Sequence, residues 1–199
     1  MQRTGGNVSR PVLAATSLVF LLVAAGPAPA ENLLTNGEFE QALSVGWNQD
    51  VGGSGYKTID RAIDFDPDPD FEARCSLYAG AGYARLSQVV DVPGTNLELD
   101  FRGSFAIGAG SSTCWPVASV CVTYRDAGGT YLGETRIYRH NEYCDWANSP
   151  TLHLIEVVNP DWQEYSLDVN DEITTNLPGV NPADVGKVEV SLYDYTSGG

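Results

Sequence analysis

The chain has 199 residues, with 11 Lys and Arg against 26 Asp and Glu, which gives a formal net charge of −15. A surface this acidic repels phosphate backbones, so nucleic acid is excluded as an expected partner, and anionic membranes are disfavoured for the same reason. The length suits one domain with a sizeable core and is too short for two comfortable ones.

The first 30 residues have the features of a secretory signal peptide. Arg3 and Arg10 make a basic start, residues 12–25 form an apolar run, and Ala28 and Ala30 mark a small-residue cleavage site. The run is shorter than the roughly 20 apolar residues that cross a bilayer. We therefore expect a secreted protein, extracellular or periplasmic, with no membrane insertion after cleavage.

Cleavage leaves 199 − 30 = 169 residues, and removing Arg3 and Arg10 leaves 9 Lys and Arg against 26 Asp and Glu, a net charge of −17. We expect residues 31–199 to form one domain. Its first segment, residues 32–47, predicts a short apolar strand, an Asn-Gly turn and a second extended step. Residues 56–65 are compatible with a strand.

An acidic loop follows, in which aspartates alternate over residues 64–70. An EF-hand calcium loop that began at Asp64 would need Gly at position 69 and Glu at position 75, where the chain has Pro69 and Cys75. The two prolines at positions 67 and 69 keep the segment extended. A solvated loop is favoured over a metal site.

Two strands with clear period-2 alternation come next, at residues 83–92 and 97–105. Gln88 falls on the apolar face of the first strand. An unpaired buried amide costs about 1–3 kcal/mol, so we expect Gln88 to find backbone partners. The second strand directs Phe101 inward.

Residues 117–138 predict a β-hairpin, with Val120 and Tyr124 on its apolar face and a glycine-rich turn at residues 126–129. A hairpin is not stable alone in water, so a second sheet must cover that face. Further strands are expected at residues 151–158, 162–169 and 188–192, and one helical turn at residues 181–184 with Asn181 as its cap.

Four cysteines remain in an exported chain, where thiols are oxidised, so two disulfides are expected. If Tyr124 faces Tyr131 across the hairpin, the register brings Cys114 near Cys144. This favours the pairs Cys114 with Cys144 and Cys75 with Cys121. A zinc site is the alternative, but there is no C-x-x-C pair and only His140 lies nearby.

Three segments resemble one family. The pattern N-L-L-x-N-G-x-F-E with a following G-W (residues 32–47), L-S-Q-V-V-D-V-P-G (86–94) and W-x-x-Y-x-L-D-V (162–169) are similar to the galactose-binding-like jelly rolls. The similarity is strongest to secreted carbohydrate-binding modules attached to glycoside hydrolases. The resemblance implies an all-β, two-sheet antiparallel β-sandwich (jelly roll), a polysaccharide or glycan as partner, and Trp47 in the core.

The resemblance also implies a structural Ca²⁺ held by a glutamate, here Glu40, and by an aspartate of a final strand. That strand is absent, because the sequence stops at residues 197–199, inside the turn that precedes it. We therefore expect either a fragment that lacks its final strand or a shorter sandwich, and a neighbouring domain is a possible partner.

No catalytic constellation is visible, so we expect a non-catalytic domain. The histidines are His140 and His153, His153 is expected to be packed in a strand, and there is no G-x-S-x-G elbow. Sugar rings stack on exposed aromatic side chains, while polar groups bind the hydroxyls. The candidate binding residues all lie in polar loops: Trp115, Trp146, Tyr143, Asn141, Asp145 and Asn148.

Two alternatives stay open. The two indoles of Trp115 and Trp146 would equally serve to cover the Cys114–Cys144 disulfide and the end of the core. The whole chain would then be a structural or adhesive extracellular domain that binds protein, because the fold by itself does not specify the ligand.

Overall fold

The computed structural model describes residues 32–63, 70–78, 80–108 and 110–198. The predicted signal peptide and most of the acidic loop at residues 64–70 lie outside this part. The elements, in chain order, are β1 (Asn48–Gly53), β2 (Tyr56–Ala62), β3 (Glu72–Tyr78), β4 (Gly82–Asp91), β5 (Glu98–Gly103), β6 (Pro116–Arg125), β7 (Tyr131–His140), β8 (Leu152–Glu156), β9 (Gln163–Asp168), α1 (Val169–Asn176), η1 (Pro182–Asp184) and β10 (Lys187–Thr196).

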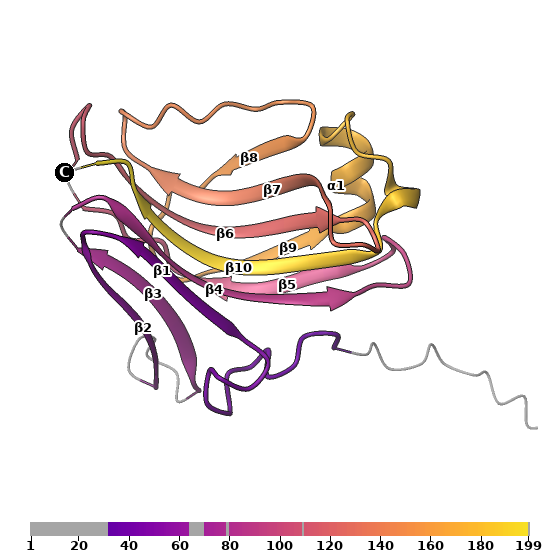
Figure 1. Cartoon of the computed structure of the whole chain (residues 1–199), viewed down its shortest axis with the longest axis horizontal. Helices are drawn as coiled ribbons and strands as arrows, with labels where there is room; N and C mark the ends of the chain where they lie inside the picture. Colours follow the sequence, from indigo (N-terminus) through magenta and orange to yellow (C-terminus); the bar gives the residue numbers. More distant parts are fainter. Residues whose placement is uncertain (1–31, 64–69, 79, 109, 199) are drawn as a thin grey trace, which may run out of the picture. The chain divides into compact units, whose positions relative to one another are not determined.

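The described strands form two layers. One layer is a six-stranded sheet in the order β1-β4-β10-β6-β7-β8, and the other consists of two separate pairs, β2–β3 and β5–β9 (Figure 1). The predicted all-β sandwich is confirmed. Its strands are antiparallel with one exception, because β8 runs parallel to β7. The long connection between these two strands, residues 141–151, makes a parallel pairing possible.

The predicted hairpin is β6–β7, but its register differs from the predicted one. Tyr124 lies opposite Gly133, and Tyr131 lies opposite Arg125. One residue of this two-residue shift arises at the turn, where Tyr131 pairs with Arg125 instead of Tyr124. The other arises at the register irregularity between Tyr124 and Arg125, because an extra residue on one strand moves every later pair. From there the ladder is regular as far as Val117 opposite His140.

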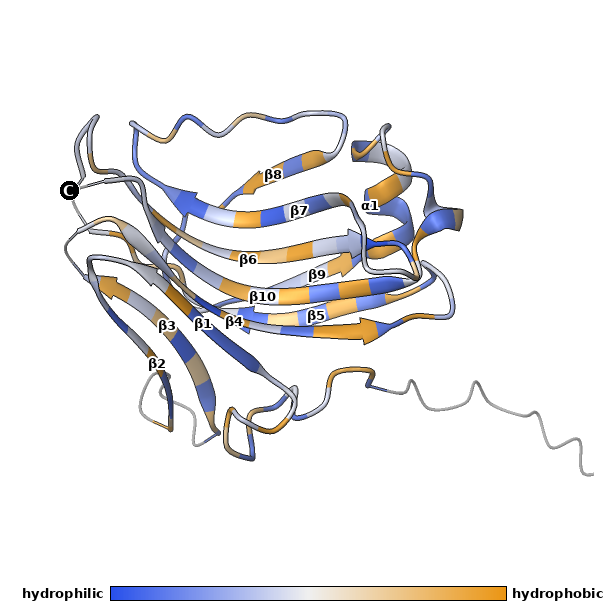
Figure 2. Cartoon of the chain, viewed as in Figure 1, coloured by the Kyte–Doolittle hydropathy of each residue, from blue (hydrophilic) through white to orange (hydrophobic). Residues whose placement is uncertain are grey.

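Alternation along the strands gives the six-stranded sheet an inner and an outer face, visible in Figure 2 as a change of colour along β10. The inner face packs against β5, β9 and α1. Val120 is buried in this main core, and Phe101 packs against it, as predicted. The buried apolar members of the core are Phe105, Val120, Val122, Tyr124, Ile137, Val157, Leu167, Val169, Ile173, Leu177, Val180, Val185, Val188 and Val190.

A smaller core lies under β2 and β3. It contains Leu43, Trp47 and Leu86, with Ile59 and Leu192 packed against it. Trp47 is therefore a core residue, and its indole Nε1 donates to the Asn36 carbonyl oxygen over 3.1 Å.

The strand predicted within residues 32–40 is wrong, because this segment consists of turns. Asn36 and Phe39 both adopt φ of 53°, which a strand does not allow. The Gln88 side chain supplies the backbone hydrogen bonds that a paired strand would make here. Its Oε1 accepts from the Thr35 N–H over 2.7 Å, and its Nε2 donates to the Thr35 carbonyl over 2.8 Å. The predicted backbone partners of Gln88 are confirmed.

The helix α1 was not predicted. Val169 was expected to continue a strand, but the Asp168 side chain accepts a hydrogen bond from the Asp171 N–H and caps a helix that begins at Val169. The predicted turn after it is confirmed as η1, where the Asn181 side chain accepts from the Ala183 N–H. No helix in the described part of the chain is long and apolar enough to span a membrane.

Candidate functional site

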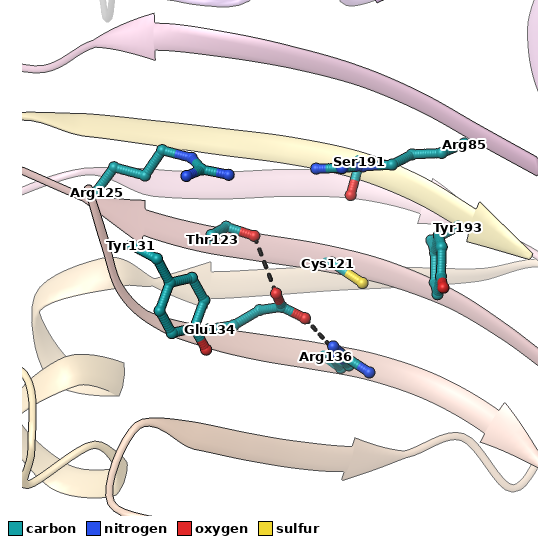
Figure 3. Close-up of a pocket in the computed structure, with 9 residues that line it drawn as sticks. All are labelled: Arg85, Cys121, Thr123, Arg125, Tyr131, Glu134, Arg136, Ser191 and Tyr193. Atoms are coloured by element: carbon teal, nitrogen blue, oxygen red, sulfur yellow. Dashed lines mark hydrogen bonds and ion pairs between the residues drawn. The ribbon is translucent and has the colours of Figure 1, made fainter. Parts of the chain in front are cut away.

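The outer face of the six-stranded sheet carries a shallow hollow with a volume of about 230 Å³. Strand pairing brings its residues together from β4, β10, β6 and β7, because residues opposite each other in a ladder share a face. Figure 3 shows the residues that line it: Arg85, Cys121, Thr123, Arg125, Tyr131, Glu134, Arg136, Ser191 and Tyr193. We call this site the outer-face hollow.

Glu189 joins two arginines beneath one side of the hollow. Its Oε2 accepts from Arg125 Nε over 3.0 Å and from Arg125 Nη2 over 2.6 Å, and its Oε1 accepts from Arg85. The Glu189 side chain is only 6% exposed, against 30% for Arg85 and 26% for Arg125. The carboxylate therefore lies below the two guanidinium groups that it holds.

On the β7 side of the hollow, Glu134 likewise binds an arginine, Arg136. Its Oε1 accepts from Arg136 Nε, and its Oε2 accepts from the Thr123 hydroxyl over 3.2 Å (Figure 3). The arginine is again the more exposed partner, at 23% against 12%. The paired groups hold each other in place, since a buried carboxylate without a partner is costly.

The floor between the arginines is neutral and polar. It consists of the Cys121 thiol, the Ser191 hydroxyl and the Tyr193 phenol. Burial raises the pKa of Cys121 to about 12, an effect that Glu134 reinforces. Burial also raises the pKa of Tyr193 to about 12, against the effect of Arg136. Both groups therefore stay protonated at neutral pH and offer hydrogen-bond donors.

Aromatic side chains continue from the hollow along the same face. The Tyr193 ring stacks with Tyr195 at a centroid distance of 6.0 Å and lies 6.1 Å from Tyr83. Tyr195 lies 6.1 Å from Trp146, and the guanidinium carbon of Arg136 sits 4.1 Å from the Trp146 ring centroid. All four rings are half-buried. We call Tyr83, Tyr193, Tyr195 and Trp146 the aromatic row.

The structure brings the predicted residues Trp115 and Trp146 into edge-to-face contact at 6.2 Å. The prediction of two exposed indoles is nevertheless wrong for Trp115. It is 8% exposed and is buried with Val117 and Tyr138 under the loop that carries Trp146. Trp146, as part of the aromatic row, is the accessible member of the pair.

The other predicted loop residues are not gathered into one site. Tyr143 and Asp145 are exposed. Asn148 Oδ1 accepts from the Leu154 N–H over 2.7 Å, and Asn141 Oδ1 accepts from the Tyr143 N–H over 3.1 Å. These two amides therefore stabilise the loop, and the binding role of all four residues stays a prediction.

The predicted disulfides are not formed, because all four cysteines carry free thiols. For Cys75 and Cys121 the reason is the sheet between them: Cys75 packs with Leu192 on the inner face, whereas Cys121 lies on the outer face. Cys114 lies in a turn closed by Ser111: the Ser111 N–H donates to the Cys114 carbonyl over 2.7 Å, and the Cys114 N–H donates to the Ser111 carbonyl over 3.1 Å. Cys144 packs against the buried residues Trp115, Val117 and Tyr138.

Glu40, the predicted calcium ligand, is exposed, and its backbone carbonyl accepts from Arg61 Nη2 over 2.7 Å. Within residues 32–63, 70–78, 80–108 and 110–198, no group of three or more His, Cys, Asp or Glu side chains has a metal-binding arrangement. Of the histidines, His153 is packed as predicted, with its Nδ1 2.5 Å from Glu172 Oε1.

Of the residues that line the outer-face hollow, the sequence singled out Cys121 as a disulfide partner and none as a binding residue. The alternation does indicate charged residues on the outer face. Glu134 and Arg136 are two residues apart and therefore share one face of β7, and Glu189 lies on the polar face of β10. Their meeting point depends on the strand order, which places β10 between β4 and β6. The alternation of polar and apolar residues does not predict the order of the strands in a sheet.

No protein-family model matches the chain, and no curated protein matches it in sequence. Among solved structures, the enzymatically active domain of bacteriophage CBA120 tailspike protein 4 is similar with a TM-score of 0.48 at 17% identity, over 84% of this chain and 20% of that chain. A carbohydrate-binding module of the β-sandwich superfamily gives a TM-score of 0.44 at 13% identity, over 84% of this chain and 60% of that chain.

A family 11 carbohydrate-binding module from Clostridium thermocellum, in complex with a β-1,3-1,4-mixed-linked tetrasaccharide, gives a TM-score of 0.36 at 10% identity, over 81% of this chain and 89% of that chain. The chain thus spans about a fifth of the length of the tailspike structure. Because these TM-scores lie below 0.5, we draw nothing about function from these likenesses.

Proposed function

We propose that the chain is a secreted, non-catalytic domain that binds a polysaccharide or glycan on the outer face of its six-stranded sheet. The observation that supports this most is the continuity of the aromatic row with the outer-face hollow. The rings of Tyr193, Tyr195 and Trp146 supply flat apolar surfaces for the C–H faces of sugars. The hollow beside them supplies hydrogen-bond donors for ring oxygens and hydroxyls.

The rigidity of the platform favours this function. Tyr83, Tyr193 and Tyr195 of the aromatic row stand with the arginines on paired strands of one sheet, so the spacing of these groups is fixed before any ligand arrives. Preorganised groups lose less conformational entropy on binding than groups on a mobile loop. This proposal moves the binding surface from the loop residues predicted from sequence to the sheet face beside them, and retains Trp146.

The experiment is affinity electrophoresis of the purified chain through gels that contain one soluble polysaccharide each, neutral or acidic, with isothermal titration for any that retard it. Tyr193→Ala should weaken binding about 10-fold, as expected for loss of one stacking ring. Tyr56→Ala is the matched control, because Tyr56 is a 67% exposed tyrosine of β2 in the other layer. Equal effects of the two substitutions, or no retardation in any gel, would refute the proposal.

A second candidate function is adhesion to protein, and one observation favours it. Tyr56 and Tyr78 lie opposite each other on β2–β3, with ring centroids 6.3 Å apart and exposed fractions of 67% and 57%. Exposed aromatic pairs are typical anchors of protein interfaces. If this face carries the function, Tyr56→Ala should abolish binding of an extracellular partner or a neighbouring domain while Tyr193→Ala should not.

A further inference from the structure

The arginines of the outer-face hollow point to a chemical class of ligand, and this inference rests on the proposed function. We propose that the hollow binds an anionic sugar residue, whose carboxylate or sulfate lies between Arg85 and Arg136 above Cys121 and Ser191.

The first argument is the local charge. Three arginines and two glutamates meet at the site, which leaves one net positive charge, in a chain whose net charge is −15. The arginines are Arg85, Arg125 and Arg136, out of 11 Lys and Arg in the whole sequence. A site with a net positive charge attracts an anion at short range, whereas the acidic surface around it repels the same anion.

The second argument is which groups remain accessible. The carboxylates of Glu134 and Glu189 are 12% and 6% exposed, and the arginines above them are 23–30% exposed. A neutral sugar is bound in part through carboxylate oxygens that accept hydrogen bonds from its hydroxyl groups. Here the arginines already occupy those acceptors, so an incoming ligand meets a surface rich in donors.

The third argument is the unused capacity of two of the arginines. Arg125 is fully engaged, since it also donates from Nη1 to the Gly129 carbonyl over 3.1 Å. Arg136 donates to Glu134 through Nε alone, and Arg85 donates to Glu189 through Nη2 alone, as far as the described residues are concerned. A guanidinium that keeps two parallel N–H groups free on one edge matches the paired oxygens of a carboxylate or sulfate.

The floor completes the match. The protonated Tyr193 phenol and the Ser191 hydroxyl lie between the arginines and offer donors without negative charge (Figure 3). Trp146, under the Arg136 guanidinium, holds that group over the face by a cation–π contact. The ring of the sugar then rests toward the aromatic row, and its charged substituent rests in the hollow.

The experiment compares two forms of one polymer backbone. Titrations with polygalacturonate and with its fully methyl-esterified form test the carboxylate, and dextran sulfate beside neutral dextran tests the sulfate. We expect at least about 10-fold tighter binding of the charged form in one of these pairs. That preference should decline between about 0.05 and 0.5 M NaCl, because salt screens charge pairs.

The matched variants remove one ion pair each without a net change of charge. Glu134→Gln with Arg136→Gln should abolish the preference for the charged form. Asp60→Asn with Arg74→Gln removes an exposed pair of the other layer, 3.5 Å apart, and should change nothing.

Each outcome decides one of the two proposals. A preference for either charged form that the first double variant abolishes supports the anionic ligand and identifies its group. Equal affinity for charged and neutral forms, or a preference that survives the double variant, overturns the anionic ligand and leaves glycan binding intact. No binding of any of the four polymers and of any neutral polysaccharide overturns both.

Discussion

The side-chain amide of Gln88 forms both of its strong hydrogen bonds with a single residue, Thr35, at 2.7 and 2.8 Å. Gln88 belongs to β4, and Thr35 to the turn-rich segment that crosses the inner face of the sheet. The pair takes the place that a strand-to-strand ladder would have, and it connects the N-terminal segment to the sandwich.

Gln88→Ala should therefore destabilise the fold by about 2 kcal/mol, since it removes two hydrogen bonds and leaves partly buried backbone groups without partners. Urea unfolding followed by tryptophan fluorescence measures the change. Gln163→Ala, at an exposed position of β9, is the matched control and should have little effect. Equal midpoints for the two variants would contradict the role assigned to Gln88.

Asp194 predicts a pH dependence of stability. Burial raises the pKa of this carboxyl from its ordinary value to about 7, although the Leu77 N–H, 3.0 Å from Oδ2, acts in the opposite direction. The folded state thus keeps its proton at a pH where the unfolded state has lost it. Stability should fall as pH rises from about 4 to about 7, and should show no further change from this group above that range.

Asp194→Asn removes this titration and keeps an acceptor for Leu77. The melting temperature of the variant should equal that of the unmodified chain near pH 4 and should exceed it by about 10 °C at pH 8. Thermal unfolding at a series of pH values gives both curves. A constant difference across the series would show that Asp194 does not titrate in this range.

Glu172 is the centre of a buried network that attaches α1 to the sheet. Its Oε1 accepts from the Thr135 hydroxyl over 2.7 Å and lies 2.5 Å from His153 Nδ1, and its Oε2 accepts from Asn176 over 2.7 Å. Glu172→Ala leaves these partners unpaired and should cost about 3 kcal/mol in unfolding free energy.

Chemical denaturation of Glu172→Ala checks this value, with Glu164→Ala, an exposed glutamate of β9, as control. Loss of helical signal at low denaturant in the Glu172 variant would locate the damage at α1. If both alanine variants unfold at the same denaturant concentration, the network does not stabilise the fold.

Cys75 and Cys121 should resist thiol reagents in the native state. Burial raises the pKa of each thiol to about 12, so almost no thiolate is present at neutral pH. Labelling with a disulfide reagent should leave both unmodified until the chain is unfolded in urea, as peptide mass spectrometry would show. Labelling of Cys121 at equal rates with and without urea would contradict the buried position on the outer face.

Alternation identified most strands, and the inward direction of Val120, Phe101 and Gln88, because a strand with one apolar face has only one way to lie on a core. It did not identify the helix after Asp168, where a capping side chain overrides a pattern that continues as a strand. It also missed the register of the hairpin, since one irregularity at Arg125 shifts every pair beyond it.

The outer-face hollow could not be predicted from the sequence for a different reason. Two of its ion pairs join residues that are 104 and 64 positions apart, Arg85 with Glu189 and Arg125 with Glu189. The alternation of residues along a strand indicates which face of the sheet a side chain occupies. It does not indicate which strand pairs with that strand. The prediction of sugar binding therefore chose tryptophans in loops, one of which the structure buries.

The place of β10 has a consequence for the order in which the molecule can assemble. This strand pairs with β4 on one side and β6 on the other, although it is the last strand of the described sequence. Until residues 187–196 have been synthesised, β4 and β6 lack the strand that lies between them in the finished sheet. The final sheet, and with it the hollow that uses residues of both strands, requires the insertion of β10, and the large sequence separation between β4 and β10 predicts slow folding.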